Sequence, residues 1–596
     1  MSAAGGNGAG GALPPRARVW APRPQRVRVV VDGAEHPMTP GGGGWWEGPE
    51  LAPGARYGFL LDDDPTPRPD PRARSLPDGV HGLAEAVAPT AAPTEGWAGR
   101  ALPDSVIYEL HVGTFTPEGT LDAAIDRLDH LVELGVDLVE LLPVNAFEGR
   151  WNWGYDGVGW FAVDVDYAGP DRDAPAAYRR FVAAAHARGL GVIQDVVYNH
   201  LGPSGNYLPL FGPYLTDALT TWGEAVNLGE PEVRAFILDD ARMWLEEYGV
   251  DGLRLDAVHA LVDPTSRHLL AELSDRTARL AEQLGRPLSL IAESDLNDPV
   301  MIAPTAEGGR GMTAQWSDDY HHALHVAITG ETSGYYADFA PLSALAKAAT
   351  RGFFHDGTFS SFRGRPHGHP LPPETPAWRL VSFAQDHDQI GNRAAGDRLP
   401  AQLAASGLGP DAVERRLAVA ALLDVLSPFT PMLFMGEEWA AGTPWQFFTA
   451  HEDPELGRAT AEGRVAEFAR MGWDPATVPD PQDPATFRRS KLDWGEPAQR
   501  DGVHTRMLAR YRELIALRRS EPELHSPPLA ALAAECDEER RTLALVRGGI
   551  VIRVNLGTEP WRIDTREERL WATDPEVAVG EGGLVLPPDT GLVSRR

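Results

Sequence analysis

The sequence predicts an α/β fold: a central (β/α)8 TIM barrel with an N-terminal β-sandwich domain and a C-terminal β-domain. From Ser105 onward, short apolar segments alternate with segments of helical period, which is typical of parallel strands joined by crossover helices. Eight such units favour a closed barrel over an open doubly wound sheet. The flanking regions instead show short strand-like runs between Gly, Pro and Asp turns.

The barrel elements follow from the spacing of apolar residues. Pro231–Tyr248 is the clearest predicted helix, because its apolar residues fall on one stripe, Pro231 starts it and Gly249 follows its end. A similar stripe runs from Leu121 to Val132. The predicted barrel strands are Val106–His111, Asp137–Leu142, Gly191–Val197, Gly252–Leu255, Leu288–Ala292, Thr313–Trp316, Arg379–Phe383 and Pro431–Phe434.

Changes in composition set the predicted domain boundaries. We expect a flexible Gly/Ala-rich tail at 1–15, a β-sandwich at 16–87, a linker at 88–104, the barrel at 105–520 and a C-terminal β-domain at 521–596. Within the barrel region, residues from about 436 to 494 are irregular and rich in Pro, Asp, Phe and Trp. We expect this insertion to lie over the barrel mouth as a lid or a subsite wall.

Composition and charge exclude several classes of partner. The net charge of −31 argues against nucleic acid and anionic membrane surfaces, although solubility alone explains much of the acidity. No apolar run is long enough to span a membrane, and residues 1–15 lack the apolar core of a secretory signal, so we expect a cytoplasmic protein. Cys536 is the only cysteine, which excludes an intramolecular disulfide. The sequence predicts no oligomeric state.

No cofactor is predicted. Gly6-x-Gly8-x-x-Gly11 fits the dinucleotide-binding fingerprint in form, but no strand precedes it and no helix follows it. The chain also lacks a P-loop and a Gly-x-Ser-x-Gly elbow, which disfavours a phosphotransferase and a serine hydrolase.

The stretch Asp251–His259 carries the first candidate catalytic group. An apolar strand brings Arg254 and Asp256 to its carboxyl end, where barrel enzymes place their catalytic residues. Residues two apart share a strand face, so Arg254 is expected beside Asp256, where its charge would keep the carboxylate ionised. An ionised, positioned carboxylate suits a covalent nucleophile. Taken alone, the pattern fits a structural Arg–Asp pair better than a catalytic one, and the rest of the chain reverses this preference.

Three further strand ends carry polar clusters in the same relative position. They are Asp195–His200, Glu293 with its neighbours, and His387–Asp388. Hydrolysis of a glycosidic bond needs one carboxylate beside the anomeric carbon and one carboxylic acid at the leaving oxygen. Carboxylates at neighbouring barrel strand ends, with histidines alongside, therefore indicate a glycoside hydrolase.

These motifs, in this order, resemble those of the α-amylase family of retaining glycoside hydrolases. The resemblance covers about residues 105–450, and the flanking β-regions are also similar to that family. It implies that Asp256 is the nucleophile, Glu293 the general acid and base with a raised pKa, and Asp388 the third carboxylate, which grips sugar hydroxyls in the transition state.

The same resemblance implies a set of substrate contacts. His200 and His387 would donate to sugar hydroxyls, Arg254 would orient Asp256, Tyr155 would form an aromatic platform under the sugar, and Asp156 would bind outer hydroxyls. Asp195 is counted with the substrate-binding residues. It also lies where amylases bind structural calcium, but the rest of such a site is not recognisable, so no metal is predicted.

Two positions depart from the family pattern. Asp386 stands where many members have Asn, which affects the expected pKa values near Asp388. Val258 and His259 stand where many amylases have Lys-His, so we expect different acceptor subsites around His259.

Stretches outside the shared motifs resemble the trehalose-releasing branch of the family. That resemblance implies hydrolysis of the α-1,4 bond next to the terminal trehalose of malto-oligosyltrehalose, with malto-oligosyltrehalose and malto-oligosaccharides as the bound molecules. Trp445–Asp453, with Trp316, Asp318 and Asp319, is the candidate wall of the trehalose pocket. The stretches that carry the resemblance are Trp153–Val158, Thr221–Gly223, Gln315–His325, Gly334–Phe339 and Val478–Trp494.

Two alternatives stay open. A 1,4-α-glucan branching enzyme, or another glucan hydrolase of the family, would share the sandwich, barrel and carboxylates; the Val478–Trp494 stretch and His321-His322 favour the trehalose-releasing branch. A non-catalytic glucan-binding protein would be expected to lack at least one of the three carboxylates, and all three are present.

Overall fold

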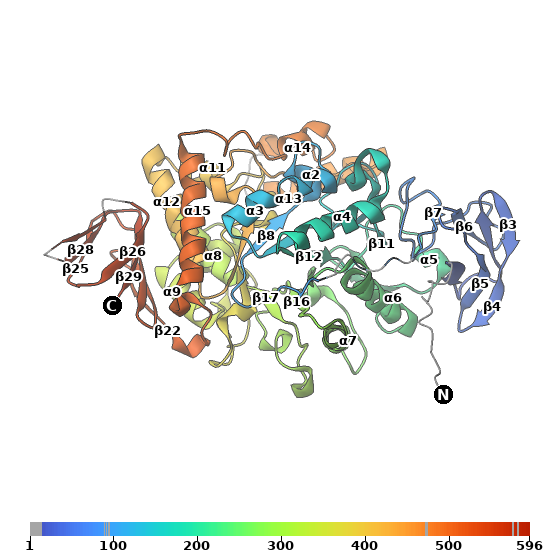
Figure 1. The fold of residues 1–596 in the computed structure, drawn as a ribbon, viewed down its shortest axis with the longest axis horizontal. Coiled ribbons are helices and arrows are strands. Elements are labelled where there is room, and N and C mark those ends of the chain that lie inside the picture. The colour runs from blue at the N-terminus through green and yellow to red at the C-terminus, as the bar shows by residue number, and fades with distance from the viewer. Residues whose placement is uncertain are drawn as a thin grey trace, which may run out of the picture.

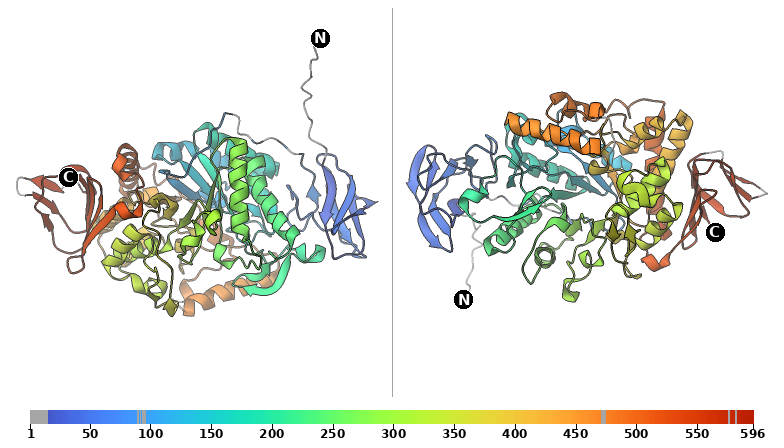
Figure 2. Two further views of the ribbon diagram at one scale, coloured as in Figure 1. Left: turned by 90° about the horizontal axis from the view of Figure 1, so that it is seen from below. Right: turned by 180° about the vertical axis from the view of Figure 1, so that it is seen from behind.

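The computed structural model describes residues 15–596 except 89, 91, 93–95, 471–474, 575–576 and 581–582. The predicted flexible tail, apart from Pro15, and part of the predicted linker lie outside the described residues. Within them, an N-terminal group of strands, the barrel and a C-terminal group of strands lie in a row (Figure 1). The two further views in Figure 2 show the same order, with the β-rich regions at opposite ends of the barrel.

A closed parallel barrel forms the centre of the described chain. Its eight strands run in the order β8, β9, β12, β15, β16, β17, β20 and β21, and β21 pairs with β8 to close the ring. All eight predicted strands are confirmed, most of them a residue or two shorter than expected. They are Ile107–Leu110, Leu138–Leu141, Gly191–Val196, Gly252–Leu255, Ser289–Ala292, Ala314–Trp316, Leu380–Ser382 and Thr430–Phe434.

Helices cover the outside of the barrel, as the helical-period segments predict. The Pro231–Tyr248 stripe is α6 (Pro231–Arg242), continued by a π-helical segment (Met243–Tyr248) that ends at Gly249 in the left-handed conformation, φ 80°. The stripe from Leu121 is broken into two helices. Apart from α13 (Pro454–Arg470), which belongs to the 436–494 insertion, the other long helices of the described residues are α4 (Ala174–Ala187), α7 (Leu269–Leu284), α8 (Asp318–Thr329), α9 (Leu342–Arg351), α12 (Pro410–Val425) and α15 (Val503–Ser520).

The short helices and hairpins connect these elements. The helices are α1 (Val112–Phe115), α2 (Leu121–Ile125), α3 (Leu128–Leu134), α5 (Leu208–Phe211), α10 (His387–Gly391), α11 (Leu399–Ala405) and α14 (Pro484–Arg489). The hairpins are β10 (Asn145–Ala146) with β11 (Gly159–Val163), β13 (Leu215–Thr220) with β14 (Gly223–Val226), and β18 (Phe359–Ser360) with β19 (Arg365–Pro366).

The N-terminal strands form two small antiparallel sheets. Trp46 donates its indole N–H to the carbonyl of Ala21 at 2.9 Å, and the Arg18 guanidinium lies 4.0 Å from the Trp45 ring, so both tryptophans pack within this region. The strand orders are β1-β5-β4 and β3-β2-β6-β7. The strands are β1 (Arg16–Trp20), β2 (Val27–Val31), β3 (Ala34–Pro37), β4 (Thr39–Gly42), β5 (Trp45–Glu50), β6 (Arg56–Leu61) and β7 (Ala84–Glu85).

The C-terminal region is also antiparallel. Among its described residues, a five-stranded sheet has the order β22-β23-β24-β29-β26 and a three-stranded sheet has the order β25-β28-β27. The strands are β22 (Leu532–Asp537), β23 (Thr542–Arg547), β24 (Ile550–Asn555), β25 (Trp561–Ile563), β26 (Glu568–Ala572), β27 (Ala578–Gly580), β28 (Gly583–Leu586) and β29 (Thr590–Arg595).

The 436–494 insertion corrects one expectation. It is not irregular throughout, because α13 (Pro454–Arg470) occupies part of it. Gly457 and Gly463 lie inside this helix and lower its intrinsic helix propensity, and most of its described side chains before Phe468 are at least partly exposed, so the sequence lacks a clear apolar stripe. The segment packs on the barrel loops: Gln446 accepts a hydrogen bond from the indole of Trp153 at 3.0 Å through its carbonyl.

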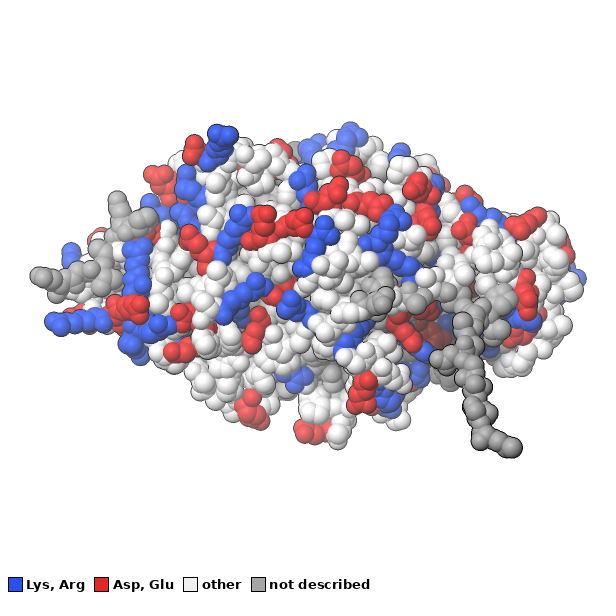
Figure 3. All heavy atoms as spheres, in the orientation of Figure 1, with Lys and Arg blue, Asp and Glu red and all other residues white. Residues whose placement is uncertain are grey.

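On the face of the molecule drawn in Figure 3, acidic side chains lie among basic ones over the barrel helices. Arg180 with Asp122 at 2.7 Å and Arg188 with Asp129 at 2.6 Å are ion pairs of this kind. Across the residues that the structure describes, no helix is both long enough and apolar enough to cross a membrane.

Asp251 fixes the start of β15, the strand that carries Arg254. It is 1% exposed. Its carboxylate accepts from the Trp97 indole at 2.7 Å and from Arg286 Nη1 at 3.1 Å, and it faces His186 Nε2 at 2.9 Å. These hydrogen bonds tie the N-terminal end of β15 to three places: α4, which carries His186, the end of α7, which Arg286 follows, and the predicted linker, which carries Trp97.

We expect Asp251→Ala to lower the free energy of unfolding by about 3–5 kcal/mol, because the buried guanidinium of Arg286 would lose its carboxylate. Denaturant unfolding followed by circular dichroism measures this loss. Asp239→Ala is the matched control: the side chain of Asp239 is 50% exposed in its pair with Arg72, so it should cost at most about 1 kcal/mol. Equal losses in the two variants would contradict the prediction.

Candidate active site

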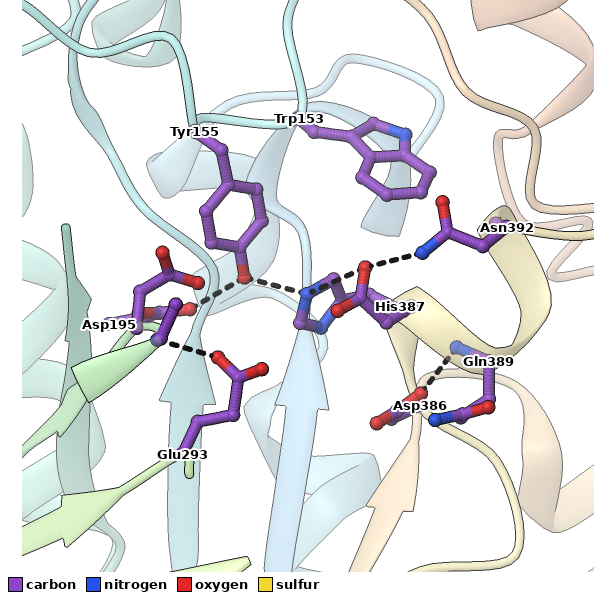
Figure 4. A network of polar contacts seen from close by, with 12 residues as sticks. Trp153, Tyr155, Asp195, Glu293, Asp386, His387, Gln389 and Asn392 are labelled. Atoms are coloured by element: carbon purple, nitrogen blue, oxygen red, sulfur yellow. Dashed lines mark hydrogen bonds and ion pairs between the residues drawn. The ribbon is translucent and has the colours of Figure 1, made fainter. Parts of the chain in front are cut away.

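Polar residues at the carboxyl ends of the barrel strands meet at one face of the barrel, as the parallel strand order requires. Figure 4 shows Asp195 and His387 joined through Tyr155, with Glu293 close by. The elements that carry the predicted residues are β12 for Asp195, β15 for Arg254, the positions directly after β15 and β16 for Asp256 and Glu293, the end of β17 for Trp316, and the start of α10 for His387 and Asp388.

The buried guanidinium of Arg254 joins three carboxylates. Its Nη1 donates to Asp195 Oδ2 at 2.7 Å and to Asp256 Oδ1 at 3.1 Å, and its Nη2 donates to Glu293 Oε2 at 2.7 Å. The side chain is 0% exposed, and it lies 4.4 Å from the Trp316 ring. Burial alone would lower the pKa of Arg254, but the surrounding acidic groups raise it well above its usual value. The site therefore contains a permanent positive charge.

Glu293 is held through both its backbone and its carboxylate. The amide of Ala257 donates to Glu293 Oε2 at 2.8 Å, and the amide of Val258 donates to the Glu293 carbonyl at 3.0 Å. Ala257 has φ 39°, a left-handed conformation that few residues other than glycine adopt, and this turn directs its N–H at the carboxylate. Burial raises the pKa of Glu293; Arg254 opposes the rise and Asp256 adds to it. Glu293 is thus suited to hold a proton.

Asp256 has a different set of partners. Besides Arg254, its Oδ2 accepts from Asn199 Nδ2 at 2.7 Å, and the same Asn199 amide donates to the Asp256 carbonyl at 3.0 Å. Asn199 is fixed in turn, because its Oδ1 lies 2.5 Å from His200 Nδ1 and His200 Nε2 lies 2.9 Å from the Tyr155 carbonyl. The Asp256 side chain is 12% exposed, so Arg254 and Asn199 orient the carboxylate from two sides while it keeps some access to solvent.

His387 joins the end of β20 to the same network. Its backbone N–H and its Nδ1 contact Glu109 at 3.0 and 2.5 Å, and its Nε2 lies 2.8 Å from the Tyr155 hydroxyl, which donates to Asp195 at 2.7 Å. The Asp388 side chain is 39% exposed, with Oδ1 3.8 Å from His387 Nε2. Burial opposes charge on His387, but Glu109 and Asp388 outweigh it and raise the pKa to about 10.

Asp195 and Trp316 lie deeper than a sugar-binding surface requires. They are 1% and 3% exposed. Burial raises the pKa of Asp195 to about 7, and Arg254 opposes the rise. Both residues contact the Arg254 guanidinium, and a direct contact with substrate stays a prediction for each.

Asp318 and Asp319 begin α8 but differ in their surroundings. Asp319 is 5% exposed, and its Oδ2 accepts from the backbone amides of Phe354 and His355 at 2.8 and 2.7 Å. Asp319 therefore anchors the loop after α9, and burial raises its pKa to about 6. Asp318 is only partly buried, and burial together with the nearby carboxylate of Glu293 raises its pKa well above its usual value.

His200 and His259 both lie near Trp222, whereas Asp156 contacts Asn152. The turn between β13 and β14 brings Trp222 over His200, with the rings stacked at 5.6 Å, and 6.4 Å from His259. Trp222 is 45% exposed. Asp156 accepts from Asn152 Nδ2 at 2.6 Å. The sequence pointed to the Thr221–Gly223 stretch only as a mark of specificity; its contact with His200 was not predicted.

Sequence reasoning missed two buried acids inside the barrel. Glu109 in β8 contacts His387, and Glu140 in β9 lies beside it in register. Burial raises the pKa of Glu140 well above its usual value. The available signal was a single acid in the middle of each apolar strand, since buried acids are rare unless they are paired or neutral.

The arrangement can perform acid–base chemistry at an acetal carbon. Besides the buried Asp195, the Arg254 guanidinium holds two carboxyl groups, Asp256 and Glu293, of which Glu293 has a raised pKa, and a third, more exposed carboxylate, Asp388, lies nearby. Carboxyl groups whose environments separate their pKa values can divide the roles of acid and nucleophile. Within the described ranges, no group of three or more His, Cys, Asp or Glu side chains has the arrangement of a metal site.

Comparison with known proteins identifies the family. The family model described as alpha amylase, catalytic domain, matches residues 73–209. A crystal structure of a Salmonella typhimurium protein provisionally named an alpha amylase superposes with a TM-score of 0.87 at 36% identity, over 98% of this chain and 97% of that one. The malto-oligosyltrehalose trehalohydrolase of Rhizobium sp. (strain M-11) is 54% identical, over 97% of each chain. The chain belongs to the malto-oligosyltrehalose trehalohydrolases.

This membership makes the protein a glycosidase of the α-amylase family. A 1,4-alpha-glucan branching enzyme of Xanthomonas campestris pv. campestris (strain 8004) is also similar, but at 31% identity over 52% of this chain and 49% of its own length. The similarity to the trehalohydrolase therefore extends over nearly the whole chain, including the flanking β-regions and the 436–494 insertion. The similarity to the branching enzyme covers 52% of the chain.

The trehalohydrolase fold buries several neutral histidines around this site. Burial lowers the pKa of His111 to about 3, and burial with the nearby His325 lowers the pKa of His322 to about 3. In the unfolded chain these groups have a pKa of about 6.5. Their contribution to stability is therefore complete above about pH 6.5 and is lost as the pH falls toward 3, because the unfolded chain takes up the protons first.

We expect the free energy of unfolding to fall by about 1.4 kcal/mol per pH unit for each such histidine below about pH 6. Urea unfolding at pH 7, 5.5 and 4.5 measures the slope. His322→Gln should make this slope shallower by the contribution of one histidine. An unchanged slope in that variant would show that His322 is not neutral in the folded protein.

Proposed function

We propose that the protein hydrolyses the α-1,4-glucosidic bond adjacent to the terminal trehalose of malto-oligosyltrehalose and releases trehalose. The observation that carries the chemistry is the hydrogen bonding of Asp256 and Glu293 to one buried guanidinium, Arg254. This shared contact favours the short separation of carboxyl groups that a retaining mechanism needs, about 5 Å, over the wider spacing of an inverting one. The substrate follows from the family.

In the first step, Asp256 attacks the anomeric carbon of the malto-oligosyl unit. Protonated Glu293 gives its proton to the glycosidic oxygen, so trehalose leaves as a neutral sugar and a covalent glycosyl-enzyme forms. The raised pKa of Glu293 keeps that proton in place before attack. Arg254 holds the Asp256 carboxylate toward the carbon, and its charge also favours the loss of the proton from Glu293.

In the second step, Glu293 acts as a base. It takes a proton from water, the water oxygen attacks the anomeric carbon, and the bond to Asp256 breaks, which releases the malto-oligosaccharide with its original configuration. Asp388, the most exposed of the three carboxylates, with His387 beside it, is positioned to hold hydroxyls of the distorted sugar. Protonated Glu293 is then restored for the next cycle.

The finer parts of this proposal concern substrate and location. Hydrolysis next to trehalose requires a pocket for an α,α-1,1-linked disaccharide on the leaving-group side, and we place it near Trp222, His259 and Asp318, where partly exposed side chains adjoin Glu293 and His200.

Transfer of the glucan to a 6-hydroxyl, as in a branching enzyme, is the second candidate reaction. A cytoplasmic location, inferred from composition, completes the proposal.

Incubation with maltotriosyl trehalose should give free trehalose and maltotriose, with little action on plain malto-oligosaccharides or amylose. Proton NMR at early times should show maltotriose formed as the α-anomer, because two inversions retain configuration. Short reducing sugars from plain chains would instead indicate an amylase, new 1,6 branches would indicate the transferase, and the β-anomer would refute double displacement.

Asp256→Asn should lower kcat by about 10⁴-fold or more, because the amide cannot form the glycosyl-enzyme. Calorimetric titration with maltotriosyl trehalose should show that binding is kept. Asp122→Asn, which alters an ion-paired carboxylate 49% exposed on α2, is the control and should retain full activity. Comparable turnover in the two variants would remove Asp256 from the mechanism.

A further inference from the structure

Glu109 makes an unusual double contact with His387. Both of its carboxylate oxygens are used: Oε2 accepts from the His387 backbone amide at 3.0 Å, and Oε1 lies 2.5 Å from His387 Nδ1. Glu109 is 1% exposed and lies in β8, 278 residues from its partner. A buried carboxylate that grips both the backbone and the ring of one residue fixes that residue's position and the orientation of its imidazole.

The other side of the imidazole determines where its protons are. Asp195 Oδ2 accepts from Arg254 at 2.7 Å and from the Tyr155 hydroxyl at 2.7 Å. Tyr155 has then spent its only proton, so at the 2.8 Å contact with His387 Nε2 its oxygen can only accept. The ring must therefore carry a proton on Nε2 as well as on Nδ1, which faces Glu109. Both nitrogens are donors, and the imidazole is positively charged.

The charged groups around His387 agree with this assignment. On its own helix, Asp388 lies 3.8 Å from Nε2, and buried Asp386 precedes it. Glu109 of β8 raises the pKa of His387, whereas burial and the charge of Arg254 on β15 oppose the rise. The remaining groups that face it are His111 at the end of β8, Glu140 of β9, the stacked ring of Tyr155 at 5.1 Å, and the rings of Trp153 and Trp316 at 6.0 and 6.1 Å.

We propose that Glu109 is a positioning residue that keeps His387 as a doubly protonated imidazolium beside Asp388 and the reacting sugar. The proposal rests on the proposed function, since it assigns the charge state of a group that would face the sugar. With Glu109 at Nδ1, the cation donates from Nε2 to the Tyr155 hydroxyl, and on the same side of the ring it offsets the negative charge of Asp388, 3.8 Å away, which would hold sugar hydroxyls.

Glu140 supplies a matched control in the next strand. It pairs with Glu109 across the parallel ladder, so the two side chains point to the same face of the barrel wall, and both are 1% exposed. Its carboxyl oxygens have no hydrogen-bond partner among the described residues, and burial raises its pKa well above the usual value, with Glu109 adding to the rise. Exchange of a neutral carboxyl group at 140 for an amide leaves the charge unchanged, whereas the same exchange at 109 removes the carboxylate that faces His387 Nδ1.

Glu109→Gln should lower kcat on maltotriosyl trehalose about 100-fold at pH 7.5, with a smaller change in KM, because the imidazole becomes neutral. The loss should shrink toward pH 5.5, where His387 regains its proton. Glu140→Gln should keep the wild-type kcat and pH profile. A Glu109→Gln enzyme with wild-type kcat, or one whose loss is equal at all pH values and matched by Glu140→Gln, would overturn the proposal.

Nitrogen-15 NMR of histidine side chains tests the charge without substrate, with the His387 signals assigned by their loss in His387→Gln. In the wild-type protein both His387 nitrogens should remain protonated up to about pH 9, and in Glu109→Gln one should deprotonate below pH 7. A neutral His387 in the wild-type protein at pH 7 would refute the proposal even if the variant failed to fold. Failure of the proposed function would appear separately, as inactivity of the wild-type enzyme.

Discussion

A single buried cation, Arg254, sets the electrostatic balance of this site. Transferring a guanidinium from water into the barrel interior is costly unless ion pairs and hydrogen bonds replace its hydration. Asp195, Asp256 and Glu293 provide that replacement, and Trp316 covers the planar face. The acids depend on the cation as much as the cation depends on them, because three carboxylates at this spacing would otherwise repel one another.

The barrel interior contains more acidic than basic side chains. The surroundings of each acid therefore determine whether it is ionised or protonated. Asp195, Glu293, Asp386 and Glu140 all have raised pKa values, with burial as the largest cause. Glu109, another buried acid, pairs directly with His387. The barrel interior thus has two centres of positive charge, Arg254 and His387, linked through Tyr155 and Asp195. Each lies beside one of the proposed catalytic aspartates.

Local patterns predicted the parts of this protein that local physics determines. The eight strands, the helix that begins at Pro231 and its end at Gly249 depend on apolar spacing, proline and glycine within a few residues, and all are present in the structure. Family motifs predicted that the carboxylates after β15, β16 and β20 would lie together. Glu109 could not be assigned in this way, because its role depends on a partner 278 residues away. Helix α13 was missed because its interior glycines and largely exposed surface weaken the pattern that sequence reasoning uses.

The left-handed turn at Ala257 has a consequence for how the acid–base residue can change. One of the donors to Glu293 is a backbone amide, which every residue except proline supplies, and proline cannot adopt a φ of 39°. Evolution can therefore not remove this hydrogen bond by a simple exchange of polar for apolar residue; it can act only on the dihedral angle, which a φ of 39° makes unfavourable for β-branched or bulky residues. Substitution at position 257 is thus restricted by backbone conformation rather than by side-chain chemistry. The effect of this hydrogen bond on the proton affinity of Glu293 is therefore kept when the side chain changes.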